Sequence, residues 1–108
     1  MGGHIRHIGT AAERIAASFL TRQGVEILAA NLVLGRGEVD LVGRHRDRLV
    51  VFEVRSVTTG ASPVEAFDTA KARRLTTLSA RLGIGRVDLV AVAFSSRFVV
   101  VRWLPHIL

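Results

Sequence analysis

Two carboxylates interrupt runs of apolar residues, Asp40 in one run and Glu53 in the next. Burying an unpaired charge in a strand costs several kcal/mol, so such a residue usually has a partner or a function. Side chains alternate along a strand, and Arg55 therefore shares a face with Glu53. If the two runs form neighbouring strands, the three side chains make a small acidic cleft bordered by one guanidinium.

The charges in this cleft do not balance. Asp40 and Glu53 together carry one more negative charge than Arg55 can neutralise. A dry pocket tolerates that excess only with a bound cation or with a proton on one carboxylate. The pattern therefore favours a cleft that binds a metal ion or faces a phosphate. The alternative is a structural network in which Arg55 and backbone amides satisfy both carboxylates.

Two helical segments are predicted to flank these runs. Apolar residues at helical spacing predict a helix over 10–23, which Gly24 is well placed to end. A second helical region is predicted over 63–82, with a capping box over 62–65 at its start and a second start signal at Asp68. Both segments have an apolar stripe for packing and a polar face for solvent.

Apolar runs between turn signals predict the strands. They lie over 25–32, 38–42, 49–57, 86–94 and 97–103. The first three leave no room for crossover helices, which indicates an antiparallel meander. Turns are expected at 35–37 and 95–96, and a polar loop over 44–48. The order α-β-β-β-α-β-β predicts an α/β fold, with a mixed central sheet flanked by helices.

Length and composition bound the class of protein. A length of 108 residues indicates one domain. The sequence has no cysteine, which excludes disulfides and thiolate metal sites. Residues 1–7 are expected to form a flexible tail. With no membrane-length apolar run and no secretory signal, we expect a cytoplasmic protein without a membrane partner. The net charge of +6, from fourteen arginines and one lysine against nine acids, favours nucleic acid as a partner.

A longer set of residues in fixed order extends beyond the acidic cleft. Its members are Gly9, Ala12, Glu13, Gly24, Ile27, Leu28, Asn31, the runs 37–42 and 52–55, Lys71, Arg74, Leu75 and the run 87–90. Together they resemble the YraN-like family of small bacterial proteins, within the PD-(D/E)xK nuclease superfamily. The resemblance implies a restriction-endonuclease-like αβββαβ core with an extra C-terminal strand, similar to Holliday-junction resolvases.

The resemblance also implies an activity and a site. It implies a metal-dependent endonuclease that hydrolyses phosphodiester bonds of DNA, with Mg²⁺ or Mn²⁺ as cofactor. Asp40 and Glu53 would hold the metal together with Glu13, and Glu38 would support these ligands. Arg55 would complete the catalytic set, at the position where the superfamily has lysine. Arginine keeps the charge and the donors but cannot act as a base, because the pKa of a guanidinium is too high for it to release a proton in a protein.

Several of these residues also have a simpler interpretation. Glu13 has the spacing of a capping box with Thr10. Asp88 is expected to pair with an arginine rather than to ligate a metal. The basic residues that either contact phosphates or form solvated faces are Arg36, Arg44, Arg46, Lys71, Arg73 and Arg74.

Three functional hypotheses follow. The first is the metal-dependent nuclease, acting on DNA. The second is a nucleic-acid-binding module that keeps the fold and the basic faces after the loss of the motif lysine. The third is an interaction subunit whose exposed strand edge pairs with itself or with a partner. A monomer or a homodimer is compatible with all three.

Overall fold

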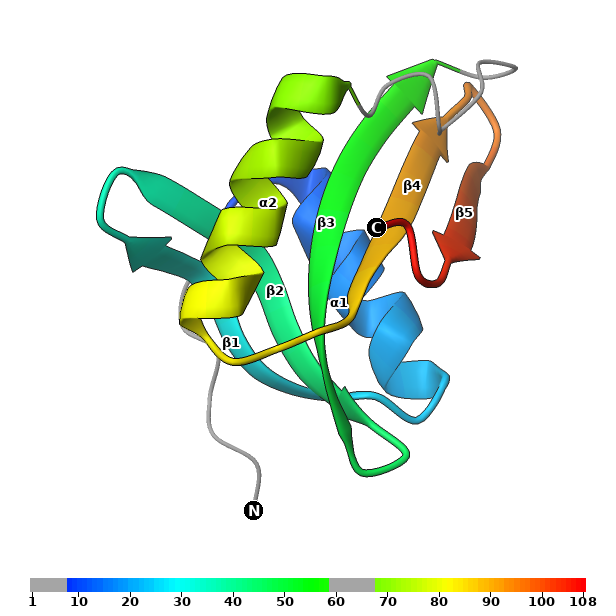
Figure 1. Ribbon diagram of the computed structural model, residues 1–108. Coiled ribbons are helices and arrows are strands. Elements are labelled where there is room, and N and C mark those ends of the chain that lie inside the picture. Colours follow the sequence, from blue (N-terminus) through cyan, green and yellow to red (C-terminus); the bar gives the residue numbers. More distant parts are fainter. Residues whose placement is uncertain (1–7, 59–67) are drawn as a thin grey trace.

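Two helices and five strands make up residues 8–58 and 68–108, the parts of the chain that this computed structural model describes (Figure 1). They are α1 (Ala11–Arg22), β1 (Glu26–Leu34), β2 (Gly37–His45), β3 (Arg48–Thr58), α2 (Thr69–Arg81), β4 (Val87–Phe94) and β5 (Val99–Leu104). The order confirms the predicted α/β fold, with an αβββαβ core and a C-terminal strand. The expected tail, 1–7, and the expected capping box, 62–65, lie outside the described residues. Neither α1 nor α2 is long and apolar enough to cross a membrane.

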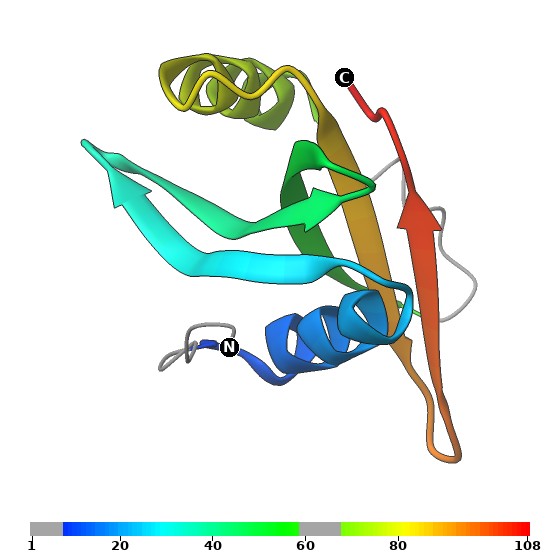
Figure 2. The same cartoon turned by 90° about the horizontal axis from the view of Figure 1, so that it is seen from below.

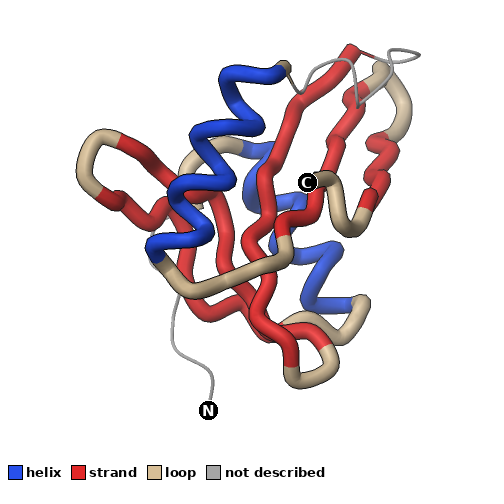
Figure 3. The backbone as a smooth tube through the Cα atoms, viewed as in Figure 1, coloured by secondary structure: helices blue, strands red, loops and turns tan. Residues whose placement is uncertain are grey.

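All five strands join one mixed sheet in the order β1-β2-β3-β4-β5. The first three are antiparallel, as the short connections predict. β3 and β4 are parallel, and β5 returns antiparallel to β4. Figure 3 shows β3 and β4 side by side, and they are paired from Val51 and Val87 to Thr58 and Phe94. A parallel pair needs a long crossover, and α2 lies in that connection.

The helices cover opposite faces of the sheet (Figures 1 and 2). On one face, α1 buries Ala16 and Leu20 in a core that also contains Phe52. On the other face, α2 buries Leu75 and Leu78 against a second apolar cluster from β2, β3 and β4. The sheet therefore has a core on both sides, and a polar residue within its strands needs a specific partner.

Both helices begin at the residues that the capping signals indicate. Thr10 and Glu13 form the predicted capping box, with hydrogen bonds of 3.2 Å from Glu13 N to Thr10 Oγ1 and 2.9 Å from Thr10 N to Glu13 Oε1. The Asp68 carboxylate accepts a hydrogen bond of 2.8 Å from Lys71 N, so Asp68 caps α2. The second start signal in the predicted helical region is therefore confirmed.

β2 and β3 separate near the middle of the sheet. Their pairing ends at Leu41 with Phe52, although β2 begins at Gly37 and β3 continues to Thr58. β1 stays paired with β2 as far as Leu34. Figure 2 shows the outer part of the β1–β2 hairpin extending away from β3.

The expected loop over 44–48 is wrong, because most of this segment is strand. β2 continues through His45 and β3 begins at Arg48. Only Arg46 and Asp47 form the turn, with φ values of 50° and 64°. Two-residue turns with positive φ match the twist of a β-hairpin. Glycine is the usual sequence signal for such a turn, and neither residue is glycine.

Candidate functional site

Asp40 lies at the point where β2 leaves β3. The register of the two strands places it opposite Glu53, just beyond the last pair, Leu41 and Phe52. There Asp40 Oδ2 accepts a hydrogen bond of 2.8 Å from the backbone N–H of Val54. The carboxylate thus satisfies a backbone donor that the interstrand ladder no longer reaches.

The carboxyl groups of Asp40 and Glu53 face each other closely enough to share a hydrogen bond when one of them is protonated. Burial, this hydrogen bond and the charge of Glu53 raise the pKa of Asp40 from 3.8 to about 7, against the opposing effects of the Val54 amide and Arg55. Glu53 itself is only 6% exposed. Two carboxyl groups in such contact require a proton or a cation between them. The structure therefore brings together the two carboxylates that the sequence singled out.

Arg55 contacts one member of this acidic pair. Its Nη2 atom lies 3.0 Å from Glu53 Oε2, with the two side chains 22% and 7% exposed. The ε nitrogen of Arg55 is buried and, within the described residues, has no hydrogen-bond partner. A buried donor without an acceptor costs free energy. Arg55 thus holds a carboxylate with one end of its guanidinium and keeps an unused donor.

An open pocket of about 750 Å³ surrounds the acidic pair. Its walls come from the start of α1, from the separated parts of β2 and β3, and from α2. Of the predicted site residues, the pocket is lined by Glu13, Arg36, Glu38, Asp40, Glu53, Arg55, Lys71 and Arg74. Acidic side chains and cations therefore share one hollow, an arrangement suited to a metal ion beside a phosphate.

Three of the predicted basic residues lie outside this pocket. Arg44, on β2, forms an exposed ion pair of 2.9 Å with Glu26. Arg46 belongs to the β2–β3 turn. Arg73 is exposed on α2. The structure does not place these three arginines beside the Asp40–Glu53 pair.

Glu13 lines the pocket but does not join the acidic pair as a third close carboxylate. In residues 8–58 and 68–108, no group of three or more acidic or histidine side chains is placed to hold a metal ion. The Glu13 carboxylate is instead occupied by the capping hydrogen bond from Thr10 N. The predicted ligand set of three is therefore reduced to Asp40 and Glu53 in this arrangement.

The residues that are present fit a hard divalent cation. Asp40 and Glu53 offer carboxylate oxygens, which are the ligands that Mg²⁺ prefers, and Mg²⁺ usually retains several waters and uses one or two carboxylates. The raised pKa of Asp40 reflects the energetic cost of ionising both groups without a compensating charge. A cation at the pair would remove that cost.

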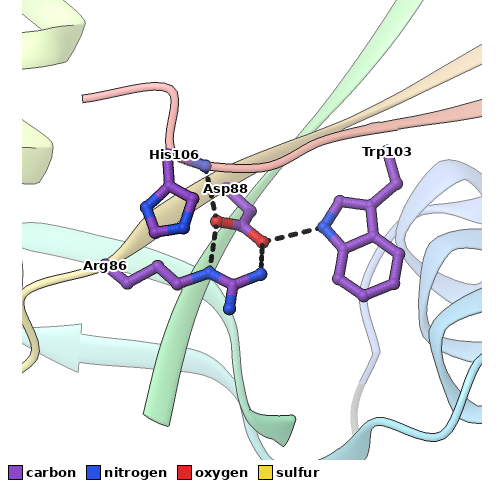
Figure 4. Close-up of polar contacts among 4 residues, drawn as sticks. All are labelled: Arg86, Asp88, Trp103 and His106. Carbon is purple, nitrogen blue, oxygen red and sulfur yellow. Dashed lines mark hydrogen bonds and ion pairs between the residues drawn. The ribbon is translucent and has the colours of Figure 1, made fainter. Parts of the chain in front are cut away.

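Asp88 is a second carboxylate within an apolar strand, and its surroundings are different (Figure 4). It is fully buried and accepts hydrogen bonds of 3.0 and 2.8 Å from Arg86, 2.8 Å from Trp103 Nε1 and 2.9 Å from the backbone N–H of His106. Burial alone would raise the pKa of Asp88, but these hydrogen bonds outweigh it and lower the pKa below its usual value. The predicted arginine partnership is confirmed.

Some residues near the site were not singled out as candidates from their type or spacing. Ser56 and Phe94 line the pocket. Asn31 has a φ of 52° and lies beside Glu13: a Cβ at Gly9 would come within 2.8 Å of Glu13 Oε1 and 3.6 Å of Asn31 Nδ2. Asparagine tolerates positive φ better than most residues. A lone asparagine within a predicted strand was therefore the sequence signal for this unusual backbone conformation.

The sequence matches known proteins over most of its length. The model of the uncharacterised protein family UPF0102 matches residues 12–92. A UPF0102 protein of Anaeromyxobacter sp. (strain Fw109-5) is 41% identical over 102 residues, which cover 85% of this chain and 77% of that protein. A relative from Symbiobacterium thermophilum is 42% identical over 84 residues, covering 72% and 71%. One from Roseiflexus castenholzii is 34% identical over 109 residues, covering 90% and 87%. The matched region includes Asp40, Glu53 and Arg55, and the chain belongs to this UPF0102, or YraN-like, family of the restriction-endonuclease-like superfamily.

Proposed function

We propose that the protein is a metal-dependent endonuclease that hydrolyses phosphodiester bonds of DNA at the pair of Asp40 and Glu53. The observation that carries this proposal is the placement of Asp40 opposite Glu53 in an open pocket with a basic rim. A purely structural pair of carboxylates would gain stability from a nearby neutralising donor for each oxygen. This pair lacks that balance, which favours a cation as its partner.

Asp40 and Glu53 would hold Mg²⁺ or Mn²⁺ through carboxylate oxygens. Such an ion, when bound, polarises a phosphate, lowers the pKa of a bound water and stabilises the leaving oxygen. The Val54 N–H fixes the Asp40 carboxylate at the edge of the pocket. Glu53 is held in place by Arg55. Both ligands are therefore oriented before a metal binds.

Arg55 would act on the phosphate rather than on the attacking water. A guanidinium donates hydrogen bonds and does not act as a base. With Nη2 at Glu53, the guanidinium still has other N–H donors for a phosphate oxygen, because arginine carries five. Arg36, Lys71 and Arg74, which line the same pocket, would neutralise neighbouring phosphates of the DNA.

A cleavage assay tests this proposal. The wild type is incubated with linear, single-stranded and four-way-junction DNA in Mg²⁺ or Mn²⁺, beside Glu53→Gln and Asp47→Asn. We expect cleavage by the wild type and by Asp47→Asn, which makes the same carboxylate-to-amide change in the exposed β2–β3 turn. Glu53→Gln should be inactive. Equal cleavage by Glu53→Gln would place the activity elsewhere.

The ion pair of Arg55 with Glu53 favours a second candidate function. At 3.0 Å it occupies a carboxylate oxygen that a metal would need. The protein would then bind nucleic acid without cutting it. If the wild type does not cleave DNA but Arg55→Lys does, the protein is a nuclease that lost activity with its motif lysine. Salt-sensitive binding without cleavage by either protein would support the binding module.

A further inference from the structure

A second hollow adjoins the carboxylate pocket, between the outer part of the β1–β2 hairpin and α2. Its volume is about 320 Å³. The hairpin contributes Arg36 and Gly37, and α2 contributes Arg74, Leu78 and Arg81. Arg36, Gly37 and Arg74 line both hollows, so the two are adjacent. A ligand in the carboxylate pocket could therefore extend into the second hollow.

The helix and the hairpin bring three guanidinium groups to this place. Arg74, Leu78 and Arg81 follow one face of α2 at helical spacing. Leu78 packs against Gly37 so closely that a Cβ there would lie 2.8 Å from its methyl groups. Beside this contact, Gly35 has a φ of +61°, and its Cβ position would lie 3.2 Å from Arg81 Nη1. The Arg81 guanidinium thus lies directly against the turn of the hairpin.

The described residues that line the second hollow supply positive charge and no counter-charge. Arg36, Arg74 and Arg81 are all exposed, and none of the described residues that line this hollow is acidic. The ion pairs found within residues 8–58 and 68–108 involve other arginines, namely Arg44, Arg55 and Arg86. Three guanidinium groups around one hollow repel one another, and a phosphate is the group whose geometry and charge they match.

We infer that Arg36, Arg74 and Arg81 form a phosphate-binding subsite for a nucleic-acid strand, next to the pocket of the acidic pair. The inference rests on the proposed function for the identity of the strand, and it adds a requirement on the substrate. The strand extends beyond the cleaved bond toward the hairpin turn, so the substrate is a polynucleotide and not a mononucleotide. Arg81 becomes a binding residue, which the sequence did not indicate.

Salt-dependent binding of single-stranded DNA in EDTA tests the subsite. Fluorescence anisotropy with a labelled oligonucleotide gives the dissociation constant at a series of salt concentrations. We expect Arg81→Ala to weaken binding about fivefold and to reduce the slope of log K against log salt by about 0.7, the value for one lost phosphate contact on a single strand. Arg81 is exposed on the last turn of α2, so circular dichroism should show an unchanged fold.

The matched control is Arg48→Ala. Arg48 is also an exposed arginine, but it begins β3 next to the β2–β3 turn and does not line either hollow. Its loss should leave the salt slope unchanged. An equal effect of both substitutions would indicate only a response to net charge and would overturn the subsite. Wild-type behaviour of Arg81→Ala would overturn it as well.

This experiment separates the subsite from the proposed reaction. EDTA removes any divalent cation, so the binding measurement does not depend on hydrolysis. If Arg81→Ala weakens binding while no DNA is cut in the Mg²⁺ assay, the subsite stands and the proposed nuclease activity fails. If DNA is cut and Arg81→Ala binds like the wild type, the activity stands and the subsite fails.

Discussion

The surroundings of Asp88 and of the Asp40–Glu53 pair show two ways of placing a carboxylate inside the same sheet. Asp88, on β4, accepts four hydrogen bonds, and one of its donors is the cationic Arg86 (Figure 4). Asp40, on β2, accepts one backbone hydrogen bond and faces the second carboxylate of Glu53. The pKa values follow this difference: the pKa of Asp88 is lowered and the pKa of Asp40 is raised.

A charged residue in an apolar strand can thus be structural or functional, depending on its surroundings. The strand pattern alone shows that the charge must be compensated, and it does so equally for both sites. The number of nearby donors then separates a structural carboxylate from a candidate ligand. Asp88 is closed to further partners, whereas the acidic pair lies in an open pocket and still needs positive charge. The following changes test that distinction.

Asp88→Asn should cause the largest loss of stability. The amide would turn a donor toward Arg86 or Trp103, and the Arg86 side chain, 17% exposed, would lose its counter-charge. Removing one partner of a buried ion pair costs about 3–5 kcal/mol. Urea unfolding measures the change. Glu26→Gln, which breaks the exposed pair with Arg44, is the control and should cost less than about 1 kcal/mol. Similar losses in both variants would show that the Asp88 cluster contributes no more to stability than an exposed ion pair.

Trp103→Phe should cost less, because it removes a single donor from Asp88. The Nε1–H to Oδ2 hydrogen bond of 2.8 Å is lost, while Arg86 still contacts the same oxygen. Hydrogen bonds to charged groups contribute about 1.5–3 kcal/mol, and we expect a loss near the lower end of that range. The midpoint of urea unfolding reports it. Phe98→Leu, a change of an aromatic residue that is 59% exposed, should have little effect. A loss for Phe98→Leu as large as for Trp103→Phe would contradict this account.

Most of the fold could be predicted from local patterns. Helical spacing with caps at Thr10 and Asp68 located α1 and α2, and short connections indicated the antiparallel β1–β3 meander. The β2–β3 connection was predicted at the right place but too long, because Arg46 and Asp47 make a two-residue turn with positive φ without glycine. The end of β2–β3 pairing could not be predicted, since it depends on how the hairpin packs against α2.

The candidate site was also predictable only where a local sequence pattern marks it. Asp40, Glu53 and Arg55 stood out because charge is costly in an apolar strand, and the structure places them in contact. Arg44 and Arg81 are both exposed arginines, and of the two only Arg44 was predicted from the sequence as a phosphate contact. Only the position of the hairpin tip beside α2 distinguishes Arg81, which lines a hollow, from Arg44, which pairs with Glu26.

Asp40→Asn should have the opposite sign from Asp88→Asn and stabilise the metal-free protein. The asparagine keeps an acceptor for Val54 N–H and offers a donor to Glu53, so the contact between two carboxyl groups becomes an ordinary hydrogen bond. At pH 8 in EDTA we expect a gain of about 1 kcal/mol, of the kind seen when a functional site is relieved of unfavourable charge. Asp47→Asn, in the exposed β2–β3 turn, should leave the free energy of unfolding nearly unchanged. A loss of stability in Asp40→Asn would show that the acidic pair is structural.

The pH dependence of stability should show the same contrast within the wild type, as the smallest effect. The pKa of Asp40 is raised from 3.8 to about 7, so between these values the folded protein keeps a proton that the unfolded chain releases. Stability therefore falls as the pH rises through this window, by less than about 1 kcal/mol because partial exposure screens the pair. Asp88 has a lowered pKa, and its contribution to stability is lost only as the pH falls below the usual aspartate range.

Unfolding in urea across pH 3–8 in EDTA should thus give a maximum of stability in mildly acidic solution. Asp40→Asn should remove the decline toward neutral pH, and Mg²⁺ should remove it in the wild type by supplying the missing positive charge. A decline that persists in Asp40→Asn would assign it to another group, and the two carboxylate environments would then differ less than their contacts indicate.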